Sequence, residues 1–539
     1  SVTVQHYALR SLDITAWEQF FQNRNLATPM AALTALHHAY GGNAKAMDII
    51  SGAILEDFSG NVEAYWQANQ DDLLIERDLE DLVTQQFDRL QQLDPDAYNL
   101  LCRMGCYRYQ DVPTVPIEGL FCLLWDVPEN RHRRVIKSLQ DRSLVDCENG
   151  EFWLHPVIRA EAIERLREDK NWEIANCQGA EFWINSIQII DSVNDAVKAF
   201  EAYYHYLDIG QFEKSGEVIL QKRLTRSVDY KELELGRSFY RLGLIEKIIS
   251  PIKLIINKTN SDYRLAGLYS ILAVSLRISG KLHKAMQLHE KVINIVDKYL
   301  NDTHEMITHQ KIDIAVSDLR HLKLVSLINL GLCNIDLWEL DLALKIFLDL
   351  RMKALENNFY EHEIINCCIA FIESHREHKE GLHEFIDHCH QLIKSSNQIG
   401  TGFRLIFLGI AYKNIGENSK SLTILHEVAL HCEKFNYVST KALAQAHIAD
   451  IFSVKKEFEL AIEYHLNAIR IFKDMGAKGD LSKALYQLGL TYRAMNEIEK
   501  SNENFQEAIR LFSEMGAPKQ VERVRKSMEN EREQSIRND

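Results

Sequence analysis

The sequence predicts a mainly α-helical protein in which a first part of helices and a hairpin precedes an α-solenoid of repeats of about 40 residues. Three observations carry this prediction. The last third of the chain repeats itself at a fixed interval, six of the eight prolines lie before residue 157, and a hairpin pattern occurs near residue 150. Proline interrupts helices, so the proline-poor remainder favours long helical runs.

The repeat is visible when the sequence is aligned on itself. A shift of 40 residues places 475–477 (Met-Gly-Ala) on 515–517 (Met-Gly-Ala), and 468–470 (Ala-Ile-Arg) on 508–510 (Ala-Ile-Arg). A shift of 80 places 408–412 on 488–492. A unit of this length cannot bury its apolar face alone, so a fixed period indicates stacked units in a solenoid.

Within one unit, the small and large apolar positions fall on one face of each of two helices. In the last unit they are Leu488, Gly489, Tyr492, Ser501, Phe505 and Ala508. This pattern resembles the tetratricopeptide repeat, lengthened from its usual ~34 residues. The same frame fits at Leu408, Leu330 and Leu272, and more loosely at Cys368.

The resemblance implies a superhelix whose concave groove is lined by the first helix of each repeat. We expect degenerate helical repeats over 171–260, tetratricopeptide-like repeats over 261–518, and a polar capping helix or tail over 519–539. The predicted groove residues are Phe407, Ile410, Lys413, His447, Asp450, Gln487 and Arg493. Exposed apolar groups among polar ones suit an amphipathic helix or extended peptide. The alternative is that Phe407 and Ile410 pack against the next repeat.

The sequence pattern over residues 71–170 predicts a helical linker and a winged helix. Asp94-Pro95 offers a cap and a first-turn proline, and further helices follow Pro116 and Pro128. Two β-like runs, 144–147 and 151–154, flank an Asn-Gly pair, which is a strong hairpin signal. The third helix carries four basic residues, so DNA binding is an alternative function. The net charge of −15 opposes a polyanion, and we expect no nucleic-acid partner.

A family resemblance covers roughly residues 1–170. Residues 41–47 (GGNAKAM) resemble the G-N-P-L-A-L motif of signal-transduction ATPases with numerous domains, the NB-ARC or NACHT-like class. Residues 54–66 resemble the continuation of that motif, 82–90 the start of the family's helical subdomain, and 154–156 (Leu-His-Pro) its histidine motif at the end of the wing. The resemblance implies that 1–70 is the remnant of an ATPase module. It also implies nucleotide-sensing roles for His155, Gly42 and Asn43.

The chain departs from this family at two points. Ala44 and Lys45 stand where the family has Pro and Leu, and the proline packs on adenine in the family. In addition, the sequence contains no G-x-x-x-x-G-K-[ST] loop to cradle phosphates and hold Mg²⁺. We therefore expect no cofactor and no ATP hydrolysis in this chain. Because residue 1 is not Met, we expect a phosphate-binding half upstream of Ser1, with ATP or ADP bound only by a longer protein.

The predicted function is regulatory and not enzymatic. The repeat array would sense a protein or peptide partner, and the winged helix would couple this to a nucleotide-dependent switch upstream, with oligomerisation through the switch. Two alternatives are a stand-alone scaffold or adaptor and a transcription regulator that binds DNA. No apolar run is long enough for a membrane helix, and ten scattered cysteines suit a reducing compartment, so we expect a cytoplasmic protein with no membrane partner.

Two features of the sequence raise the question of a metal site. The span 362–390 is rich in His and Cys but shows no repeated ligand spacing, so surface histidines on a degenerate repeat are expected and no metal site. His426-Glu427 and His304-Glu305 are each followed by a His one position too far for the zinc-protease motif.

Overall fold

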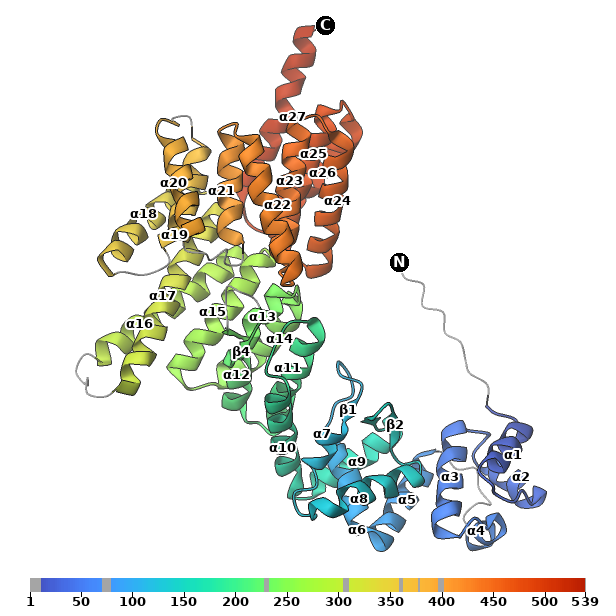
Figure 1. The fold of residues 1–539 in the computed structure, drawn as a ribbon. Coiled ribbons are helices and arrows are strands. Elements are labelled where there is room, and N and C mark those ends of the chain that lie inside the picture. Colours follow the sequence, from blue (N-terminus) through green and yellow to red (C-terminus); the bar gives the residue numbers. More distant parts are fainter. Residues whose placement is uncertain are drawn as a thin grey trace. The chain divides into compact units, whose positions relative to one another are not determined.

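The computed structural model describes residues 11–69, 79–226, 232–303, 310–357, 362–376, 379–395 and 402–538 (Figure 1). The chain forms two compact units. Unit 1 comprises residues 1–186 and 201–211, and unit 2 comprises 187–200 and 212–539. Helix α11 (Val193–Asp208) contributes residues to both.

Unit 1 begins with four helices around a small aromatic core that includes Trp17 and Phe21. They are α1 (Ile14–Asn23), α2 (Met30–Ala39), α3 (Ala44–Asp57) and α4 (Val62–Asn69). Ion pairs connect α1 and α3 to later parts of the unit. The Arg24 guanidinium lies 2.7 Å from Asp48, and that of Arg142 lies 2.8 Å from Asp57.

The rest of unit 1 is a helical cluster with a small antiparallel sheet. Its helices are α5 (Leu79–Leu93), α6 (Pro95–Met104), α7 (Ile117–Phe121), α8 (Glu129–Asp141), α9 (Pro156–Glu168) and α10 (Asn171–Ser186). The sheet order is β1-β3-β2, with β1 (Val115–Pro116), β2 (Asp146–Glu148) and β3 (Glu151–Trp153).

Two local predictions for unit 1 are confirmed. The Asp94 carboxylate caps α6 by accepting the Ala97 N–H, with Pro95 in the first turn. Strands β2 and β3 form a hairpin whose turn residues, Asn149 and Gly150, have φ of 53° and 81°. Positive φ at both central positions matches the twist of the strands, and Asn-Gly accepts it readily.

The predicted start of the repeats at residue 171 is wrong. Helix α10 packs on α6, α7 and α9 and so belongs to unit 1. Its small residues Gly179 and Ala180 allow this close contact. A Cβ on Gly179 would lie 2.7 Å from the ring of His205 in the unit 1 half of α11. The degenerate spacing in this part of the sequence reflects a different set of neighbours, not a weakened repeat.

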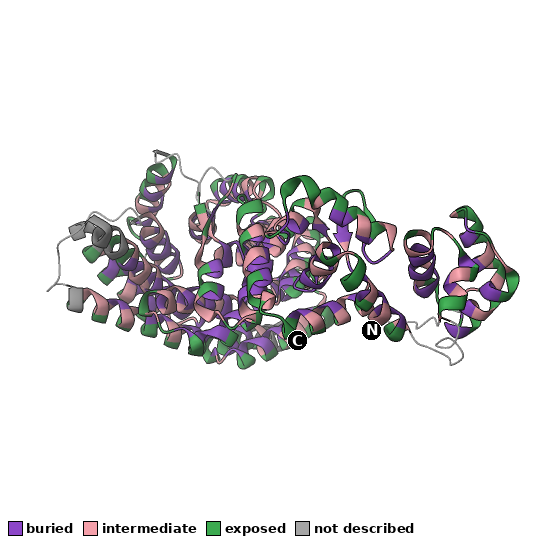
Figure 2. Cartoon of the chain, turned by 90° about the horizontal axis from the view of Figure 1, so that it is seen from below, coloured by how far each residue is buried: buried purple, intermediate pink, exposed green. Residues whose placement is uncertain are grey.

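Unit 2 is an α-solenoid of antiparallel helix pairs, as predicted. It starts with α12 (Phe212–Leu220) and the two-stranded sheet of β4 (Lys222–Leu224) and β5 (Glu232–Glu234). The helices that follow are α13 (Leu235–Arg241), α14 (Ile245–Ile255), α15 (Asp262–Ile278), α16 (Leu282–Thr303), α17 (Gln310–Asp336), α18 (Leu340–Asn357), α19 (His362–Ser374), α20 (Leu382–Ser395), α21 (Phe403–Asn414), α22 (Asn418–Lys434), α23 (Val438–Val454), α24 (Phe458–Met475), α25 (Lys478–Ala494), α26 (Ile498–Glu514) and α27 (Pro518–Asn538). A short 3₁₀ turn, Ile256–Lys258, follows α14. Buried, intermediate and exposed residues alternate along these helices (Figure 2).

The predicted alternation of small and large residues is confirmed inside the repeats. A Cβ on Gly489 would lie 2.6 Å from the Phe505 ring, and one on Gly331 would lie 2.5 Å from the Phe347 ring. A hydroxyl strengthens the same contact. Ser501 Oγ donates to the Gly489 carbonyl at 2.9 Å, and Ser421 Oγ donates to the Gly409 carbonyl at 2.6 Å. These glycines therefore set the distance between the two helices of each pair.

The solenoid also contacts itself across its own turn. Helix α13 packs on α23, and α15 packs on α25, five helix pairs later in the sequence. The Arg241 guanidinium donates to the Phe435 carbonyl at 2.9 Å. A Cβ on Gly280 would lie 3.0 Å from Met515, in the turn before α27. One turn of the superhelix thus spans five pairs, and its ends meet within unit 2.

The segment predicted as a polar capping helix or tail, 519–539, falls in α27, and the first half of this helix is less polar in its contacts than its sequence indicates. Val521 and Val524 of α27 are buried, and Gln520 is only 1% exposed. The Gln520 amide donates to the Asp336 carbonyl at 3.2 Å, and the Lys519 ammonium lies 2.5 Å from Glu339. The first half of α27 therefore joins the last repeat to the turn after α17.

In the described part of the chain, no helix is both long enough and apolar enough to cross a membrane.

Candidate functional site

The inner face of unit 2 encloses a cavity of about 700 Å³. Every odd-numbered helix from α13 to α27 contributes to its wall. This is the volume of a ligand-binding site rather than of a packing defect. The odd-numbered helices are the first members of the successive pairs, so the concave side is formed as the repeat pattern implies.

Six of the seven predicted groove residues line this cavity. They are Phe407, Ile410 and Lys413 on α21, His447 and Asp450 on α23, and Gln487 on α25. Arg493 does not line it. Its guanidinium donates to the Met528 carbonyl of α27 and lies 5.2 Å from the centre of the Phe505 ring, so it fixes α27 on α26. Partner contact by these residues remains a prediction.

The apolar part of the wall is more buried than predicted. Phe407 is 8% exposed and Ile410 is 7% exposed, because both belong to the core that runs through α17 to α23. The Phe407 ring packs edge-on against Phe371 at 5.2 Å and Phe403 at 5.1 Å. The expectation of freely exposed apolar groups is therefore wrong, and the alternative of packing between repeats describes them better. Only a small part of the Phe407 and Ile410 side chains is therefore exposed at the cavity.

A buried ionic cluster lies beside these rings. The Lys413 ammonium lies 2.9 Å from the Asp450 carboxylate, and His447 Nδ1 lies 3.1 Å from it. Burial alone would raise the pKa of Asp450, but the Lys413 ammonium and the His447 ring hold it well below its usual range. Burial also lowers the pKa of His465 to about 4, against the attraction of Asp450. At neutral pH this cluster therefore holds an ionised Asp450 carboxylate inside the wall.

A second ionic cluster closes the turn of the superhelix. Asp336 of α17 accepts from Arg277 of α15 at 2.8 Å and from Lys483 of α25 at 2.5 Å. Burial would raise the pKa of Asp336, but the two cations lower it below its usual value. Breaking one partner of such a buried cluster leaves an uncompensated charge. The cluster therefore ties together helices that lie far apart in sequence.

Trp338 and Arg523 are among the wall residues that the sequence analysis missed. Trp338 occupies the turn between α17 and α18 with φ of 65°, and Arg523 stacks on its ring at 3.9 Å. Residues 520, 521, 524, 527 and 528 share one face of α27, and this amphipathic spacing was the available signal. The strongly charged remainder of the segment concealed it.

In unit 1, the GGN segment has structural roles. Gly42 has φ of 72°, and a Cβ there would lie 2.3 Å from the Leu12 carbonyl oxygen, so only glycine fits. The Asn43 side chain caps α3 by accepting the N–H groups of Lys45 and Ala46 at 2.9 and 3.1 Å. Neither observation tests the nucleotide-sensing role that the resemblance implies.

His155 is the N-cap residue of α9, where its Nδ1 accepts the Val157 N–H at 3.4 Å. Burial lowers the pKa of His155, and the nearby Lys45 ammonium adds to the effect. The Lys45 ammonium lies 2.7 Å from Asp146 of the hairpin. The segments that carry the family resemblance, around residues 43 and 155, are thus brought to one region of unit 1.

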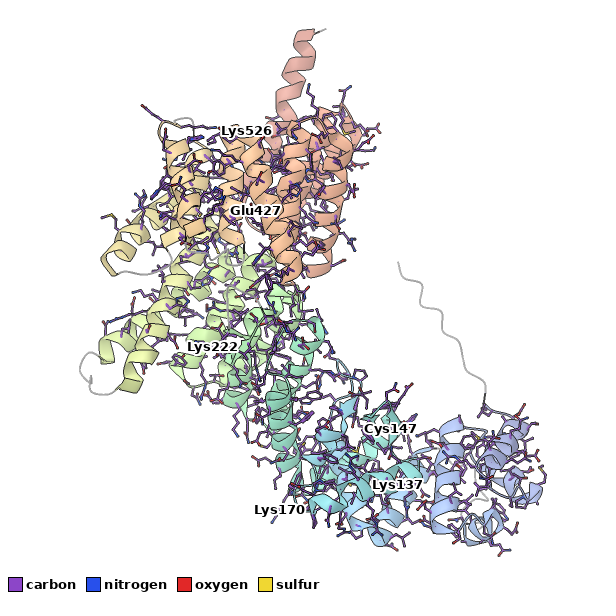
Figure 3. All side chains as sticks on the ribbon, viewed as in Figure 1. Lys137, Cys147, Lys170, Lys222, Glu427 and Lys526 are labelled. Atoms are coloured by element: carbon purple, nitrogen blue, oxygen red, sulfur yellow. The ribbon has the colours of Figure 1, made fainter. Side chains whose placement is uncertain are left out.

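The basic helix of unit 1 is α8. Arg131 is paired with Asp96 at 2.7 Å, and the Arg133 guanidinium lies 5.8 Å from the centre of the Phe121 ring. Lys137, labelled in Figure 3, projects from the same helix. Two of its four basic residues thus make contacts within unit 1, and the DNA-binding alternative remains an untested prediction.

The His- and Cys-rich span forms two helices, α19 and α20. Within the described part of the chain, no three His, Cys, Asp or Glu side chains gather as a metal site requires. Cys367, Cys368 and Cys389 are buried free thiols, and His375 packs on the rings of Trp338 and Phe371. His378 lies outside the described residues.

The fold and the cavity together define the class of protein, an α-solenoid of tetratricopeptide-like helix pairs with a ligand-sized interior. No family model matches the chain. An uncharacterised WD repeat-containing protein from Nostoc sp. is 29% identical over 129 residues, which are 24% of this chain and 10% of that protein. The chain thus matches only about a tenth of the length of this curated relative.

Several solved structures are similar in the arrangement of their helices. One is a signal transduction ATPase with numerous domains and a tetratricopeptide repeat sensor from Pyrococcus horikoshii, at 14% identity and a TM-score of 0.46, covering 94% of this chain and 67% of that chain. Another is aspartyl phosphate phosphatase F from Bacillus subtilis, at 12% identity and a TM-score of 0.38, covering 79% and 94%. A third is NprR in complex with its cognate peptide NprX, at 14% identity and a TM-score of 0.35, covering 52% and 77%. At these scores the likeness assigns neither a family nor an activity.

Proposed function

We propose that this chain is a regulatory protein whose unit 2 captures a peptide, free or as a segment of a protein, inside the superhelix. The observation that carries the proposal is the cavity of about 700 Å³ lined by the inner helices. Its wall combines apolar edges from Phe407 and Ile410 with polar groups such as Gln487 and His447. A mainly apolar cavity with a few placed polar groups is typical of ligand sites.

The same proposal gives unit 1 the task of passing on the signal. The hairpin and helices over 94–156 support the predicted winged helix, and the Lys45–Asp146 pair joins the segment around Asn43 to the hairpin that precedes His155. A nucleotide-dependent switch in a longer protein would then be the target. A stand-alone adaptor without nucleotide function is the alternative.

Filling the cavity tests the proposal. Gln487 is partly exposed on the inner side of α25, and its side chain makes no hydrogen bond within the described residues. Gln487→Trp should therefore block capture without removing an existing contact. The measurement is equilibrium dialysis of the chain against a pool of short synthetic peptides, with the retained peptides quantified by mass spectrometry.

Gln506→Trp is the matched control, because Gln506 is exposed on the outer helix α26. We expect the wild-type chain and the Gln506 variant to retain a subset of the pool, and the Gln487 variant to lose most of that retention at an unchanged helical signal. Equal retention by both variants, or no retention by the wild type, contradicts the proposal.

A further inference from the structure

The cavity wall carries more positive than negative groups, although the chain as a whole has a net charge of −15. Seven Arg or Lys side chains line it, against three Asp side chains. Most of the cations have an acidic partner. Lys413 pairs with Asp450, Arg277 and Lys483 pair with Asp336, Arg237 pairs with Glu234, and Arg404 pairs with Glu363.

Arg241 and Arg523 are the exceptions among these seven, with no ion pair to any described residue. Arg241 is satisfied by the main chain, because it donates to the carbonyls of Phe435 at 2.9 Å and Ile190 at 2.5 Å. For the Arg523 guanidinium, no main-chain carbonyl among the described residues takes the place of an acid. This guanidinium donates a long hydrogen bond, 3.4 Å, to the Gln520 side chain one turn earlier on α27, and it also contacts the Tyr486 hydroxyl, so its partners among the described side chains are neutral.

The Arg523 guanidinium is nevertheless held in a defined position. It lies 3.9 Å from the centre of the Trp338 ring and 4.8 Å from that of Tyr486. The Tyr486 hydroxyl is in turn fixed by a 2.9 Å hydrogen bond to Ser527 of α27. Stacking leaves the edge of a planar guanidinium, where its N–H donors lie, free for an acceptor.

The carboxylates of Asp450 and Asp336 in the cavity wall do not fill this role. The Asp450 carboxylate attracts Arg523 but is already bound by Lys413 and His447, and Asp336 is bound by Arg277 and Lys483. A preorganised guanidinium with free donors in an enclosed site favours a carboxylate, which it can bind through two parallel hydrogen bonds. The missing acid must therefore come from the ligand.

We propose that Arg523 binds the side-chain carboxylate of an Asp or Glu in the captured peptide, with Trp338 and Tyr486 holding the guanidinium in place. This inference rests on the proposed function, since it names the chemistry of the same ligand. An acidic side chain within the peptide fits better than a terminal carboxylate, because the two wall cations without an ion pair to a described residue, Arg241 and Arg523, lie on different helices, α13 and α27, rather than together at one point.

The test uses three pools of short synthetic peptides with the same randomised apolar background. The first pool is blocked at both ends and carries one central Glu, the second is blocked and carries Gln there, and the third carries Gln and a free terminal carboxylate. The full chain is dialysed against each pool. We expect the Glu pool to be retained about tenfold better than the blocked Gln pool, as one charge-assisted pair provides.

Arg523→Gln should abolish this preference while the blocked Gln pool is retained as before, which also shows that the variant is folded. Arg523→Lys should keep part of the preference, because it retains the charge without the planar fork. Arg510→Gln is the control, since Arg510 is exposed on α26 and pairs with Glu507 there.

An unchanged preference in the Arg523→Gln variant overturns the inference. A preference of the wild type for the free-terminus pool over the Glu pool also overturns it. Equal retention of the Glu and blocked Gln pools refutes the inference alone, whereas retention of no pool refutes the proposed function together with it.

Discussion

His289 of α16 is a fully buried imidazole, and neither of its ring nitrogens has a hydrogen-bond partner among the described residues. Burial lowers the pKa of His289 to about 3, and the Arg277 guanidinium contributes. A buried polar group without a partner costs about 1–3 kcal/mol. The buried imidazole of His289 therefore lowers the free energy of unfolding of the solenoid.

We expect His289→Leu to raise the free energy of unfolding by about 1–3 kcal/mol at neutral pH. The gain should grow as the pH falls from 6.5 towards 3, because the unfolded wild-type imidazole binds a proton in this range while the folded one does not. Denaturant titrations at several pH values measure it. His388→Leu, at an exposed position of α20, is the control. It should change neither the free energy of unfolding nor the dependence of that free energy on pH. A destabilised His289→Leu variant would show that the imidazole has a stabilising role.

The helix pairs are the elements at which sequence and structure agree most closely. The spacing of Gly489, Ser501 and Phe505 predicted one pair, and the structure places all three in contact. Such contacts are local, so their period is visible in the sequence. The position of α10, the docking of α27 and the burial of Phe407 were not predictable in this way, because each depends on neighbours far away in sequence that no period marks.

Helix α25 contains two glycines in different surroundings, which allows a matched comparison. We expect Gly489→Ala to destabilise unit 2 by about 1–3 kcal/mol, since the new Cβ would meet the Phe505 ring at 2.6 Å. Gly479→Ala should be neutral or stabilising by up to about 1 kcal/mol, because its nearest neighbour lies at 3.6 Å and alanine favours helix. Thermal melting followed by circular dichroism compares them, and equal melting temperatures would contradict the assigned helix spacing.

Helix α27 should behave as two segments. Removal of 518–539 uncovers Trp338 and Tyr486 and takes away the contacts of Gln520 and Arg523, so the melting temperature should fall by several degrees. Removal of 530–539 alone should leave it nearly unchanged. Lys526, exposed on α27 and labelled in Figure 3, offers a further control, because Lys526→Ala should have no effect. An equal loss in both truncations would contradict the described docking.

For the whole molecule, the fold class was predictable and the ligand chemistry was not. The period of 40 residues indicated the solenoid, and the repeat pattern indicated that the first helix of each pair lines its concave side. The unpaired state of Arg523 depends on which acids lie near it after the superhelix has closed, and a linear sequence does not contain that information.

We expect the chain as given to bind ATP and ADP weakly or not at all, because its sequence has no phosphate-binding loop and carries Ala44 in place of the proline of the resembling family. Isothermal titration calorimetry with each nucleotide measures this. Micromolar affinity together with measurable ATP turnover would contradict it and would require a different site for phosphate.

Because α13 contacts α23 and α15 contacts α25, this solenoid is closed on itself and differs from an open array of repeats. In an open array each repeat touches only its neighbours, and units can be gained or lost from the ends with little penalty. Here the sixth pair packs on the first and the seventh on the second, so the number of repeats is fixed. Insertion of a single repeat would put Lys483 opposite the wrong partner and separate it from Asp336. The array should accordingly unfold in one cooperative step, and its evolution should proceed by substitution within repeats rather than by their duplication.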